Sequence, residues 1–449
     1  MSTEKPPRSS ALKAKLFEKI QVARPRVQRL AKEFANVVID HVTIGQAIGG
    51  ARDVRCLVTD ISYLDPQEGI RFRGKTIPET FSLLPRLPGH EQPTVEAFFY
   101  FLLTGEIPTS KETSEVIEDW RSRSLVPPYV FGVLGALPHD THPMTMLSTA
   151  VLSLQRESIF ARRYAEGLKK TDQWDPMYED AVNLIAKLPR IAAYIYRLKY
   201  KGDSRIEPDP ELDFGGNFAH LMGIPHPYDE VSRMHFILHS DHESGNVSAH
   251  ATHLVASALS DCYYAYSAGL NGLAGPLHGL ANQEVLAWIQ NVMKKLGGKL
   301  PTEQELVAFL WDTLKAGRVI PGYGHAVLRK TDPRFTAQNE YARRHLPDDP
   351  LLKLVNMLHK LAPGVLTEHG KTKNPWPNVD AHSGVIQWHY GVREWEFYTV
   401  LFGVGRGLGV LANIVWDRAL GYTLERPKSV TTDMLEAWGV GGGRPGISE

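Results

Sequence analysis

Apolar residues recur at three- and four-residue intervals along most of this chain, and that period predicts helices. The pattern begins in residues 11–34 and returns in segments bounded by Pro or Gly, at 95–103, 144–154, 180–188, 191–200, 228–238, 250–270, 303–313 and 350–361. Pro189 separates two of these segments and is expected to end or kink a helix. Strand-like runs occur only at 38–43 and 58–61. The predicted fold class is therefore mainly α, with very little β.

The chain has 449 residues, about three times a ~150-residue domain, so more than one lobe is expected. A stiff, Pro-rich stretch at residues 374–378 suits a loop between lobes. We predict a large helical domain made of residues 1–280 and 391–449, and a smaller helical domain made of residues 281–390.

Composition excludes several classes of protein. Fifty Lys and Arg residues balance fifty Asp and Glu residues, so no global basic field exists to attract nucleic acid or anionic lipid. Any bound anion must be met by local charge. The most apolar stretch, residues 398–416, approaches membrane-spanning length, but Arg406 lies in its middle. We therefore expect a buried helix there, with no nucleic acid and no membrane among the partners.

Cysteine content and the N-terminal segment bear on the cellular compartment. The two cysteines are far apart and form no CxxC motif, which argues against a secreted disulfide scaffold and a cysteine-ligated zinc fold. Residues 1–32 lack the apolar core of a signal peptide, and Glu4 and Glu18 do not suit a transit peptide. The expected location is the cytoplasm of a bacterium, and a processed form in the mitochondrial matrix is the alternative.

Four histidines lie within fifteen residues, at His239, His242, His250 and His253. Histidines three residues apart could share a metal ion if both lie on one helical face. Gly245 and Asn246, however, indicate a break between the two pairs. Two other interpretations stay open: polar residues at helix ends, or a histidine that binds substrate.

A Gly-rich segment, residues 271–284, leads into an apparent helix. Pro276 suits the first helical turn, which would place His278 among the free backbone N–H groups. The helix dipole would then keep the imidazole neutral, and a neutral N–H donor is suited to stabilising an enolate oxygen. The alternative is a histidine that merely terminates a helix.

Two further segments carry groups suited to anion binding and base catalysis. In residues 321–325, two glycines around a tyrosine let the backbone approach a ligand, and the cations Arg329, Lys330 and Arg334 follow. A surface turn with solvated charges is the alternative.

Asp380 follows the Pro-rich stretch and is either a helix N-cap or a general base. Arg406 lies in an apolar helix and so requires an anion, from the protein or from a ligand.

One glycine-rich motif is rejected. Residues 403–409 miss the dinucleotide-binding spacing by one residue and follow no strand, so we interpret their glycines as positions of close helix packing.

Taken together, these segments resemble the citrate synthase family, in the form found in mitochondria and some bacteria. The resemblance extends from residues 49–52 and 64–74, through the three histidine segments, to Glu425-Arg426-Pro427-Lys428. It implies a nearly all-helical homodimer in which a small domain closes over the active site. The implied enzyme is an acyltransferase of EC class 2.3.3 that condenses acetyl-CoA with oxaloacetate and hydrolyses citryl-CoA to citrate and CoA, in the tricarboxylic acid cycle.

The resemblance assigns His278, His325 and Asp380 as the catalytic residues. Asp380 would remove a methyl proton from acetyl-CoA, His278 would donate to the enolising carbonyl oxygen, and His325 would polarise the ketone of oxaloacetate. No metal and no cofactor are implied, since acetyl-CoA is a substrate.

The resemblance also assigns the substrate contacts. Oxaloacetate would be bound by His242, Arg334, Arg406 and Arg426, and Arg426 is expected to come from the partner subunit. CoA would contact Arg52, Arg162, Gly322, Tyr323, Gly324, Arg329, Lys371 and Lys373. The alternatives are a 2-methylcitrate synthase that uses propionyl-CoA and, from another class, a metal-dependent hydrolase.

Overall fold

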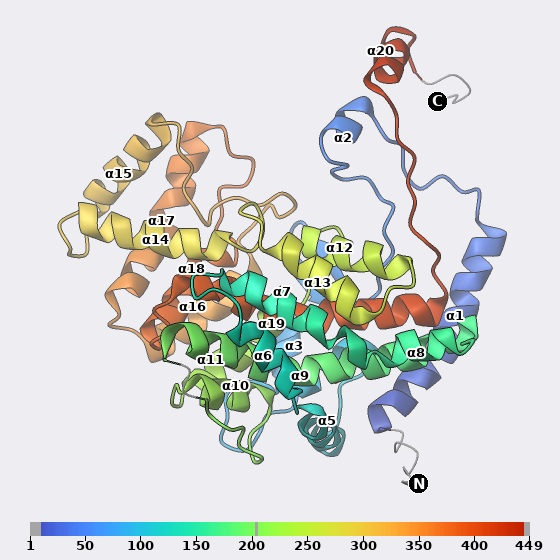
Figure 1. Ribbon diagram of the computed structural model, residues 1–449. Helices are drawn as coiled ribbons and strands as arrows, with labels where there is room; N and C mark the ends of the chain where they lie inside the picture. The colour runs from blue at the N-terminus through green and yellow to red at the C-terminus, as the bar shows by residue number, and fades with distance from the viewer. Residues whose placement is uncertain (1–9, 203–204, 444–449) are drawn as a thin grey trace.

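The computed structural model describes residues 10–202 and 205–443. Helices dominate it (Figure 1). Those before residue 280 are α1 (Ala11–Glu33), α2 (Ile44–Ile48), α3 (Ile77–Leu83), α4 (Val95–Thr104), α5 (Ser110–Arg123), α6 (Pro128–Gly135), α7 (Pro143–Ser153), α8 (Ile159–Ala165), α9 (Trp174–Tyr200), α10 (Phe214–Met222), α11 (Tyr228–Leu238), α12 (Val247–Ser257) and α13 (Cys262–Leu273). Those after it are α14 (Ala281–Lys295), α15 (Glu303–Lys315), α16 (Pro333–His345), α17 (Pro350–His369), α18 (Asp380–His389), α19 (Tyr398–Leu420) and α20 (Thr432–Val440). Single turns of 3₁₀ helix occur at Leu154–Glu157, Lys170–Asp172 and Trp395–Phe397. The predicted mainly α class is confirmed.

Strands are confined to one antiparallel hairpin in the part of the chain that the structure describes. It consists of β1 (Ser62–Asp65) and β2 (Gly69–Phe72), with Ser62 opposite Phe72. The expectation of strand structure at 38–43 and 58–61 is wrong, because neither run has a partner to share a hydrogen-bond ladder. Residues 58–61 instead lead directly into β1.

Helix α9 runs without a break through Pro189, so of the two predicted outcomes, an end or a kink, the structure excludes the end. Proline removes one backbone hydrogen bond from a helix. Residues on both sides of Pro189 are buried, including Leu188 and Ile191 at 0% exposure, and this packing offsets the lost bond.

Helix α19 forms the centre of the core, and all of its side chains are buried. Among the described residues, Trp395–Leu420 is the single stretch long and apolar enough to span a membrane, and 89% of its apolar window lies inside the protein. The expected buried helix is therefore confirmed. A Cβ atom added at Gly409 would lie 2.4 Å from the Ser240 carbonyl oxygen, and one at Gly407 would lie 2.8 Å from Leu188 Cδ1. The glycines of this segment thus serve close packing, as predicted.

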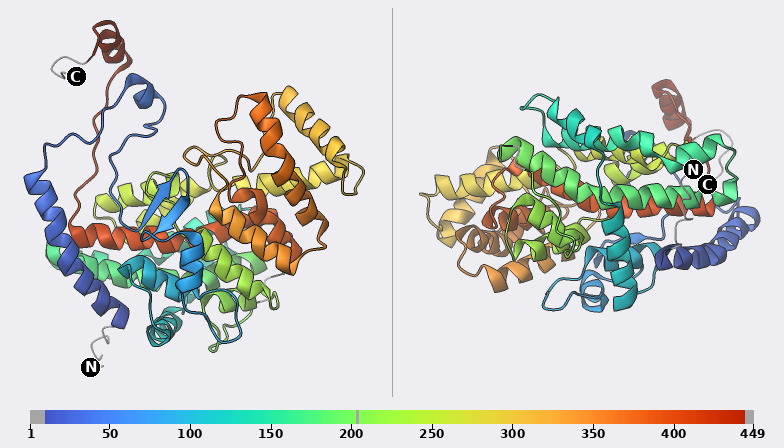
Figure 2. Two further views of the ribbon diagram at one scale, coloured as in Figure 1. Left: turned by 180° about the vertical axis from the view of Figure 1, so that it is seen from behind. Right: turned by 60° about the horizontal axis from the view of Figure 1, so that its bottom comes forward.

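The helices gather in two groups. Helices α14 to α18 pack largely on one another and lie together at one end of the molecule, as the views in Figure 1 and Figure 2 agree. Helix α19 packs against α9 and α11 and also contacts α14, so it joins the two groups. The group α14 to α18 falls within the predicted small domain, residues 281–390; that these are two domains moving as units stays a prediction.

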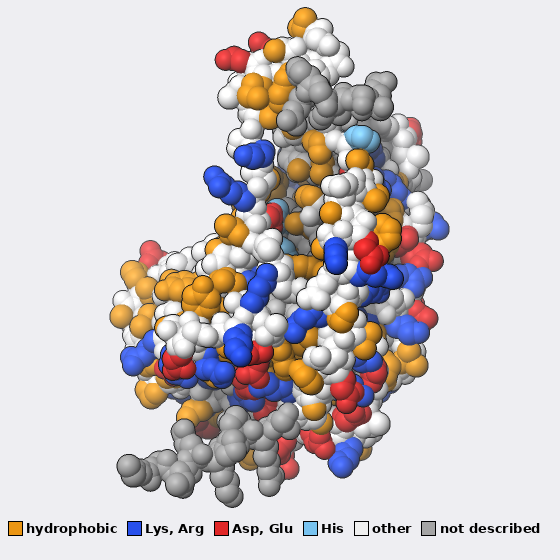
Figure 3. Space-filling model, turned by 90° about the vertical axis from the view of Figure 1, so that its right-hand side faces the viewer, with side chains coloured by type: hydrophobic (Ala, Val, Ile, Leu, Met, Phe, Trp, Pro, Cys, Tyr) orange, Lys and Arg blue, Asp and Glu red, His pale blue; other side chains and the backbone are white. Residues whose placement is uncertain are grey.

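Two arms leave the body near α1. The N-terminal arm, residues 34–58, carries α2, and the C-terminal arm, residues 421–443, carries α20 (Figure 1). Neither α2 nor α20 contains a buried residue. Figure 3 shows hydrophobic side chains on the surface of this projecting part.

Candidate active site

The segment between α11 and α12 brings His242 to the surface of α19. Asn246 caps α12 by accepting the Ala249 N–H at 3.1 Å. The buried carboxylate of Asp241 accepts a hydrogen bond from Ser62 Oγ at 2.7 Å, and the same hydroxyl accepts the N–H of Glu243 at 2.9 Å. The hairpin therefore fixes the backbone on both sides of His242.

Two loops that are fifty residues apart in sequence form one unit around His325 and Asp380. The Gly324 N–H donates to the Trp376 carbonyl at 3.1 Å, and the Asn378 N–H donates to the Gly322 carbonyl at 2.9 Å. The Asn378 side chain then donates to the Gly324 carbonyl and accepts the N–H of Asp380, each at 3.0 Å. Asn378 thus positions the loop that carries His325 relative to the start of α18.

Gly322 has a positive φ of 81°, which glycine adopts without strain. A Cβ atom at Gly322 would lie 2.8 Å from the Cα of Ala381, so glycine also permits close contact between the two loops. The adjacent Tyr323 forms a bridge with Pro377, and burial raises the pKa of its phenol. The close neighbour of Gly322 is thus Ala381 of the protein itself, and the approach of this backbone to a ligand stays a prediction.

His325 is held as a neutral donor. Its Nδ1 accepts the N–H groups of Val327 and Leu328 at 3.0 and 3.1 Å, so the ring proton lies on Nε2. Burial, assisted by the charge of Arg334, lowers the pKa of His325 to about 4. The His325 ring lies edge-on to His242, with centroids 5.3 Å apart.

His278 lies in a turn between α13 and α14, three residues before α14 begins. The expectation that it belongs to the first helical turn, with Pro276, is wrong, because turns occupy residues 274–280. The Ser248 N–H donates to His278 Nε2 at 3.2 Å, which leaves the proton of the neutral ring on Nδ1. Burial, with a contribution from Arg406, lowers the pKa of His278 to about 4. The ring is neutral as predicted, but for another reason.

Asp380 is the first residue of α18 and does not cap it, because Val379 occupies the N-cap position. Its Oδ1 is buried without a hydrogen-bond partner. Burial raises the pKa of Asp380 to about 7, against the opposing effect of the Arg334 and Arg406 charges. A carboxyl group with this pKa is a base of useful strength near neutral pH.

The two arginines are paired differently. Arg334 is 3% exposed and forms an ion pair with Asp332 at 2.7 Å. Arg406, at 1% exposure, donates to the Asn246 side chain at 2.9 Å and to the His239 carbonyl at 3.2 Å, and both acceptors are neutral. Burial lowers the pKa of Arg406 to about 10. The Arg406 guanidinium therefore carries a buried charge suited to an anionic ligand.

These side chains converge on His242. Burial, with the charges of Arg334 and Arg406 and the nearby rings of His325 and His278, lowers the pKa of His242 well below its ordinary value. His242 Nε2 is buried without a partner. The structure thus brings together residues from the α11–α12 segment, the α13–α14 turn, the two joined loops and α19.

The other sequence-predicted residues lie apart from this cluster. Arg52 and Arg426 are exposed on the two arms, and Arg162 is exposed on α8. Lys371 and Lys373 are exposed before the Pro-rich loop. Arg329 is exposed, and its guanidinium donates to the carbonyl of Val327 at 2.7 Å. The single chain does not bring these cations to His242.

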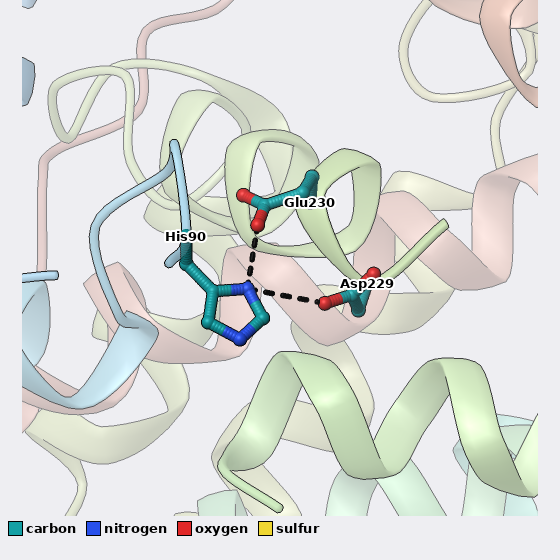
Figure 4. A group of neighbouring side chains, drawn as sticks. All are labelled: His90, Asp229 and Glu230. Carbon is teal, nitrogen blue, oxygen red and sulfur yellow. Dashed lines mark hydrogen bonds and ion pairs between the residues drawn. The ribbon is translucent and has the colours of Figure 1, made fainter. Parts of the chain in front are cut away.

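The four-histidine segment does not gather into a metal site within the described residues. His250 pairs with Glu425 at 2.8 Å, His253 pairs with Asp417 at 2.7 Å, and His239 stacks on His235 with centroids 4.0 Å apart. A different group, His90, Asp229 and Glu230, has metal-like geometry (Figure 4). Arg233 donates to Asp229 at 2.9 Å and so already supplies the positive charge there.

Sequence reasoning missed four residues that position this site: Asn246, Ser248, Asp332 and Asn378. Asn246 and Asp332 were recognisable as helix N-caps, since each is followed by a helical pattern. Their bonds to Arg406 and Arg334 arise only in the fold.

Comparison with known proteins agrees with this arrangement. Residues 50–428 match the family model described as "Citrate synthase, C-terminal domain". The chain is 51% identical over 429 residues to "Citrate synthase, mitochondrial" of Xiphias gladius, covering 95% of this chain and 91% of that protein. It is 50% identical over 427 residues to "Citrate synthase 4, mitochondrial" of Arabidopsis thaliana, covering 95% and 90%.

The crystal structure of citrate synthase from Pyrobaculum aerophilum superposes with a TM-score of 0.74 at 28% identity, covering 86% of this chain and 92% of that one. The match to this family model and the identity of about half to these relatives place the chain in the acyltransferase class of enzymes. The chain belongs to the citrate synthase family, and its fold and activity are those of that family.

Proposed function

We propose that His278, His325 and Asp380 carry out the condensation of acetyl-CoA with oxaloacetate. The observation that supports this most is the pairing of a carboxyl group of pKa about 7 with two neutral imidazoles of pKa about 4. At neutral pH, such a set contains a base and two N–H donors that do not protonate it.

Asp380 takes a proton from the methyl group of the acetyl thioester while His278 Nδ1–H donates to the thioester carbonyl oxygen. The resulting enolate carbon attacks the ketone carbon of oxaloacetate. His325 Nε2–H donates to the ketone oxygen, which becomes the hydroxyl oxygen of citryl-CoA. Water then cleaves the thioester to give citrate and CoA. The two proton donors in these reaction steps are His278 and His325, and backbone N–H groups set the tautomer of each ring.

Oxaloacetate is proposed to lie against His242, Arg334 and Arg406. The Arg406 charge has neutral hydrogen-bond partners, so a substrate carboxylate would complete its pairing. Arg334 keeps Asp332 as a partner, which orients its guanidinium and leaves one side of the fork for a second carboxylate.

The active protein is proposed to be a homodimer in which Arg426 completes the partner's site. Helices α2 and α20 contain no buried residue, although short helices are stabilised mainly by packing. Exposed apolar side chains on these arms include Ile39 at 71%, Ile48 at 73% and Val440 at 93%. A second copy that covers the arms would remove this apolar surface from water and carry Arg426 towards a neighbouring site.

CoA binding is proposed at Arg52, Arg162, Gly322, Tyr323, Gly324, Arg329, Lys371 and Lys373, with movement of the small domain bringing the exposed cations to the phosphates. Their exposure and charge suit phosphate groups. The chemistry uses side chains of the protein and no cofactor.

The direct test is release of CoA thiol from acetyl-CoA, measured with and without oxaloacetate. Rapid release only with oxaloacetate agrees with the proposal, whereas release without it would indicate a thioesterase. The same assay with propionyl-CoA separates the alternative 2-methylcitrate synthase, because a higher kcat/KM for propionyl-CoA would reverse the choice of substrate. Activity that survives exhaustive chelation in metal-free buffer would exclude the metal-dependent hydrolase.

The mitochondrial matrix is the proposed location, since the relatives at about half identity are named as mitochondrial. These relatives give no support to the expected bacterial cytoplasm. Fractionation of the source cell against a matrix marker tests the location.

A further inference from the structure

A cavity lies away from the catalytic cluster, between α4, α5, α9 and α10. Its volume is about 250 Å³. None of the residues that line it belongs to the proposed catalytic or substrate-binding set. Its lining residues come from α4, α5, α9, α10 and the segment that leads into α10, so it is separate from the catalytic cluster.

The walls are mostly apolar. Ile117 and Trp120 of α5, Ala186 of α9, Phe214 and Leu221 of α10, and several prolines supply them. A dry apolar cavity of about 150 Å³ is enough to hold benzene. A cavity of about 250 Å³ therefore suits an aromatic ring with a short side chain.

Three of the lining residues carry buried polar atoms without a hydrogen-bond partner: Trp120 Nε1, Arg121 Nε and Glu96 Oε2. Trp120 and Glu96 are 3% and 1% exposed. The first two atoms are donors only. Leaving buried donors unpaired is costly, so a ligand that accepts these bonds would be stabilised by them.

Glu96 adds a third donor. Its Oε1 accepts the Phe214 N–H at 2.8 Å, which leaves Oε2 for a proton. Burial and the neighbouring Asp213 raise the pKa of Glu96 to about 8, so the carboxyl group is mostly neutral at pH 7. In that form it donates a hydrogen bond and does not repel an anion.

Two of the remaining charged side chains at the cavity, Asp213 and Arg190, are paired, whereas Asp209 has no ion-pair partner among the described residues and only accepts the Glu211 N–H at 2.9 Å. Asp213 binds Arg233 at 2.7 Å, with both side chains 1% exposed. Arg190 pairs with Glu207 at 2.6 Å. Arg121 has only the loose and mostly exposed Glu118 at 3.5 Å, so its positive charge is the least compensated at the cavity.

We propose that this cavity binds a small carboxylic acid with an aromatic or compact apolar body, whose carboxylate accepts from Arg121 and Trp120. The apolar body fills the space beside Ala186 and Phe214, and the neutral Glu96 donates to the ligand. This site is independent of acetyl-CoA and oxaloacetate.

Binding of 3-phenylpropionate to the full chain, measured by titration calorimetry, tests the proposal. Saturating oxaloacetate is present throughout, so that the arginines of the catalytic site are occupied. We expect a Kd of about 1 mM or tighter, as a ligand of this size can reach. Absence of measurable binding at several times that concentration would overturn the site.

Two variants test the location. Ala186→Leu fills the cavity and should weaken binding at least about tenfold, whereas Ala165→Leu, exposed on α8 outside the cavity, should not. Arg121→Gln removes the positive charge and leaves a shorter polar side chain, and it should also weaken binding about tenfold, whereas Lys111→Gln on the same helix should not. Thiol release by each variant should equal that of the unmodified chain. Equal affinity in all four variants would place the ligand elsewhere and refute the proposal.

The neutral amide 3-phenylpropanamide tests the class of ligand. It keeps the ring and removes the negative charge, so we expect it to bind at least about tenfold more weakly. Equal affinity for the amide and the acid would refute the carboxylate assignment. Because binding is measured directly, failure here leaves the thiol-release result, and hence the proposed function, unaffected.

Discussion

Backbone amides decide which nitrogen carries the proton in each proposed catalytic histidine. His278 receives the N–H of Ser248, and His325 receives the N–H groups of Val327 and Leu328. A backbone donor is not removed by substitution of its own side chain, although the Ser248 hydroxyl also lies 2.9 Å from His278 Nε2 and would be lost with that residue. The donors that face a substrate are therefore Nδ1 of His278 and Nε2 of His325.

Replacing the proposed base tests its role in the most direct way. Asp380→Asn keeps the size and burial of the side chain but removes its capacity to accept a proton. We expect kcat to fall by about 10³, within the range that a general base contributes. Thiol release under saturating substrates measures it, and an unchanged circular dichroism spectrum serves as the control for folding. Turnover within a factor of a few of the original would contradict the assignment.

The same substitution should stabilise the protein above acid pH. The pKa of Asp380 is about 7 in the fold, against an ordinary 3.8 when unfolded. The folded state holds the proton more tightly, so stability falls as pH rises from 3.8 to about 7. The Asp380→Asn variant carries no ionisable group at this position, so its stability does not fall for this reason over the same pH range. Melting curves should show a higher Tm for Asp380→Asn at pH 8 by a few °C.

The difference in Tm should shrink towards zero as the pH falls below 3.8, where Asp380 becomes protonated in both the folded and the unfolded state. An equal or lower Tm for the variant at pH 8 would mean that the ionised carboxylate is not costly to the fold.

The sequence predicted which residues form the site better than it predicted the hydrogen bonds and the burial around them. His242, His325, Asp380 and Arg406 fall in one cluster, which their segment patterns and the family resemblance indicated. Bonds that depend on distant segments, such as Ser248 to His278, could not be read from spacing. The neutral state of His278 was predicted from a helix dipole, but burial is its main cause.

Among the helices, α19 depends most on glycines for its close packing against neighbouring segments. Gly409→Ala would place a Cβ atom 2.4 Å from the Ser240 carbonyl oxygen, a backbone atom that cannot rotate away. We expect a loss of about 2 to 3 kcal/mol in stability, as for overpacked cores. Calorimetric measurement of thermal unfolding gives this loss of stability.

Gly364→Ala in α17 is the matched control. It lies inside a helix, is exposed, and would meet no atom within 4 Å. Alanine should stabilise that position by about 1 kcal/mol, because glycine is the weaker helix former. If both substitutions shifted stability in the same direction, close packing would not explain the glycines of α19.

Helical periodicity predicted α1, α7, α11 and α15, because each buries a face of the helix, and the long apolar run predicted α19. The segment at 250–270 forms two helices, α12 and α13, separated at residues 258–261. Periodicity failed where tertiary context overrides local preference. Pro189 stays inside α9 because its neighbours are buried, and the run at 38–43 forms no strand because nothing pairs with it.

For the whole molecule, the proposed crossing of Arg426 can be tested by mixing subunits. A chain with Arg426→Ala and a chain with His278→Ala should each be nearly inactive as homodimers. In a mixed dimer, one site would combine an intact His278 from the first chain with an intact Arg426 from the second. Random reassortment makes half of the dimers mixed, with one competent site each, so about a quarter of the original thiol-release activity should return.

A mixture of Asp380→Asn and His278→Ala chains is the control, since both residues come from the same chain within a site. In the mixed dimer each site then lacks one of them, and no activity should return. Recovery in the control, or none in the first mixture, would contradict the crossing.

If Arg426 crosses to the partner's site as proposed, the projecting C-terminal arm has a consequence for heredity. A chain with a faulty arm would harm a site that belongs to its companion, while its own site could still be served by a sound neighbour. Two differently defective alleles in one cell could then compensate each other, so the severity of a variant would depend on the allele it is inherited with.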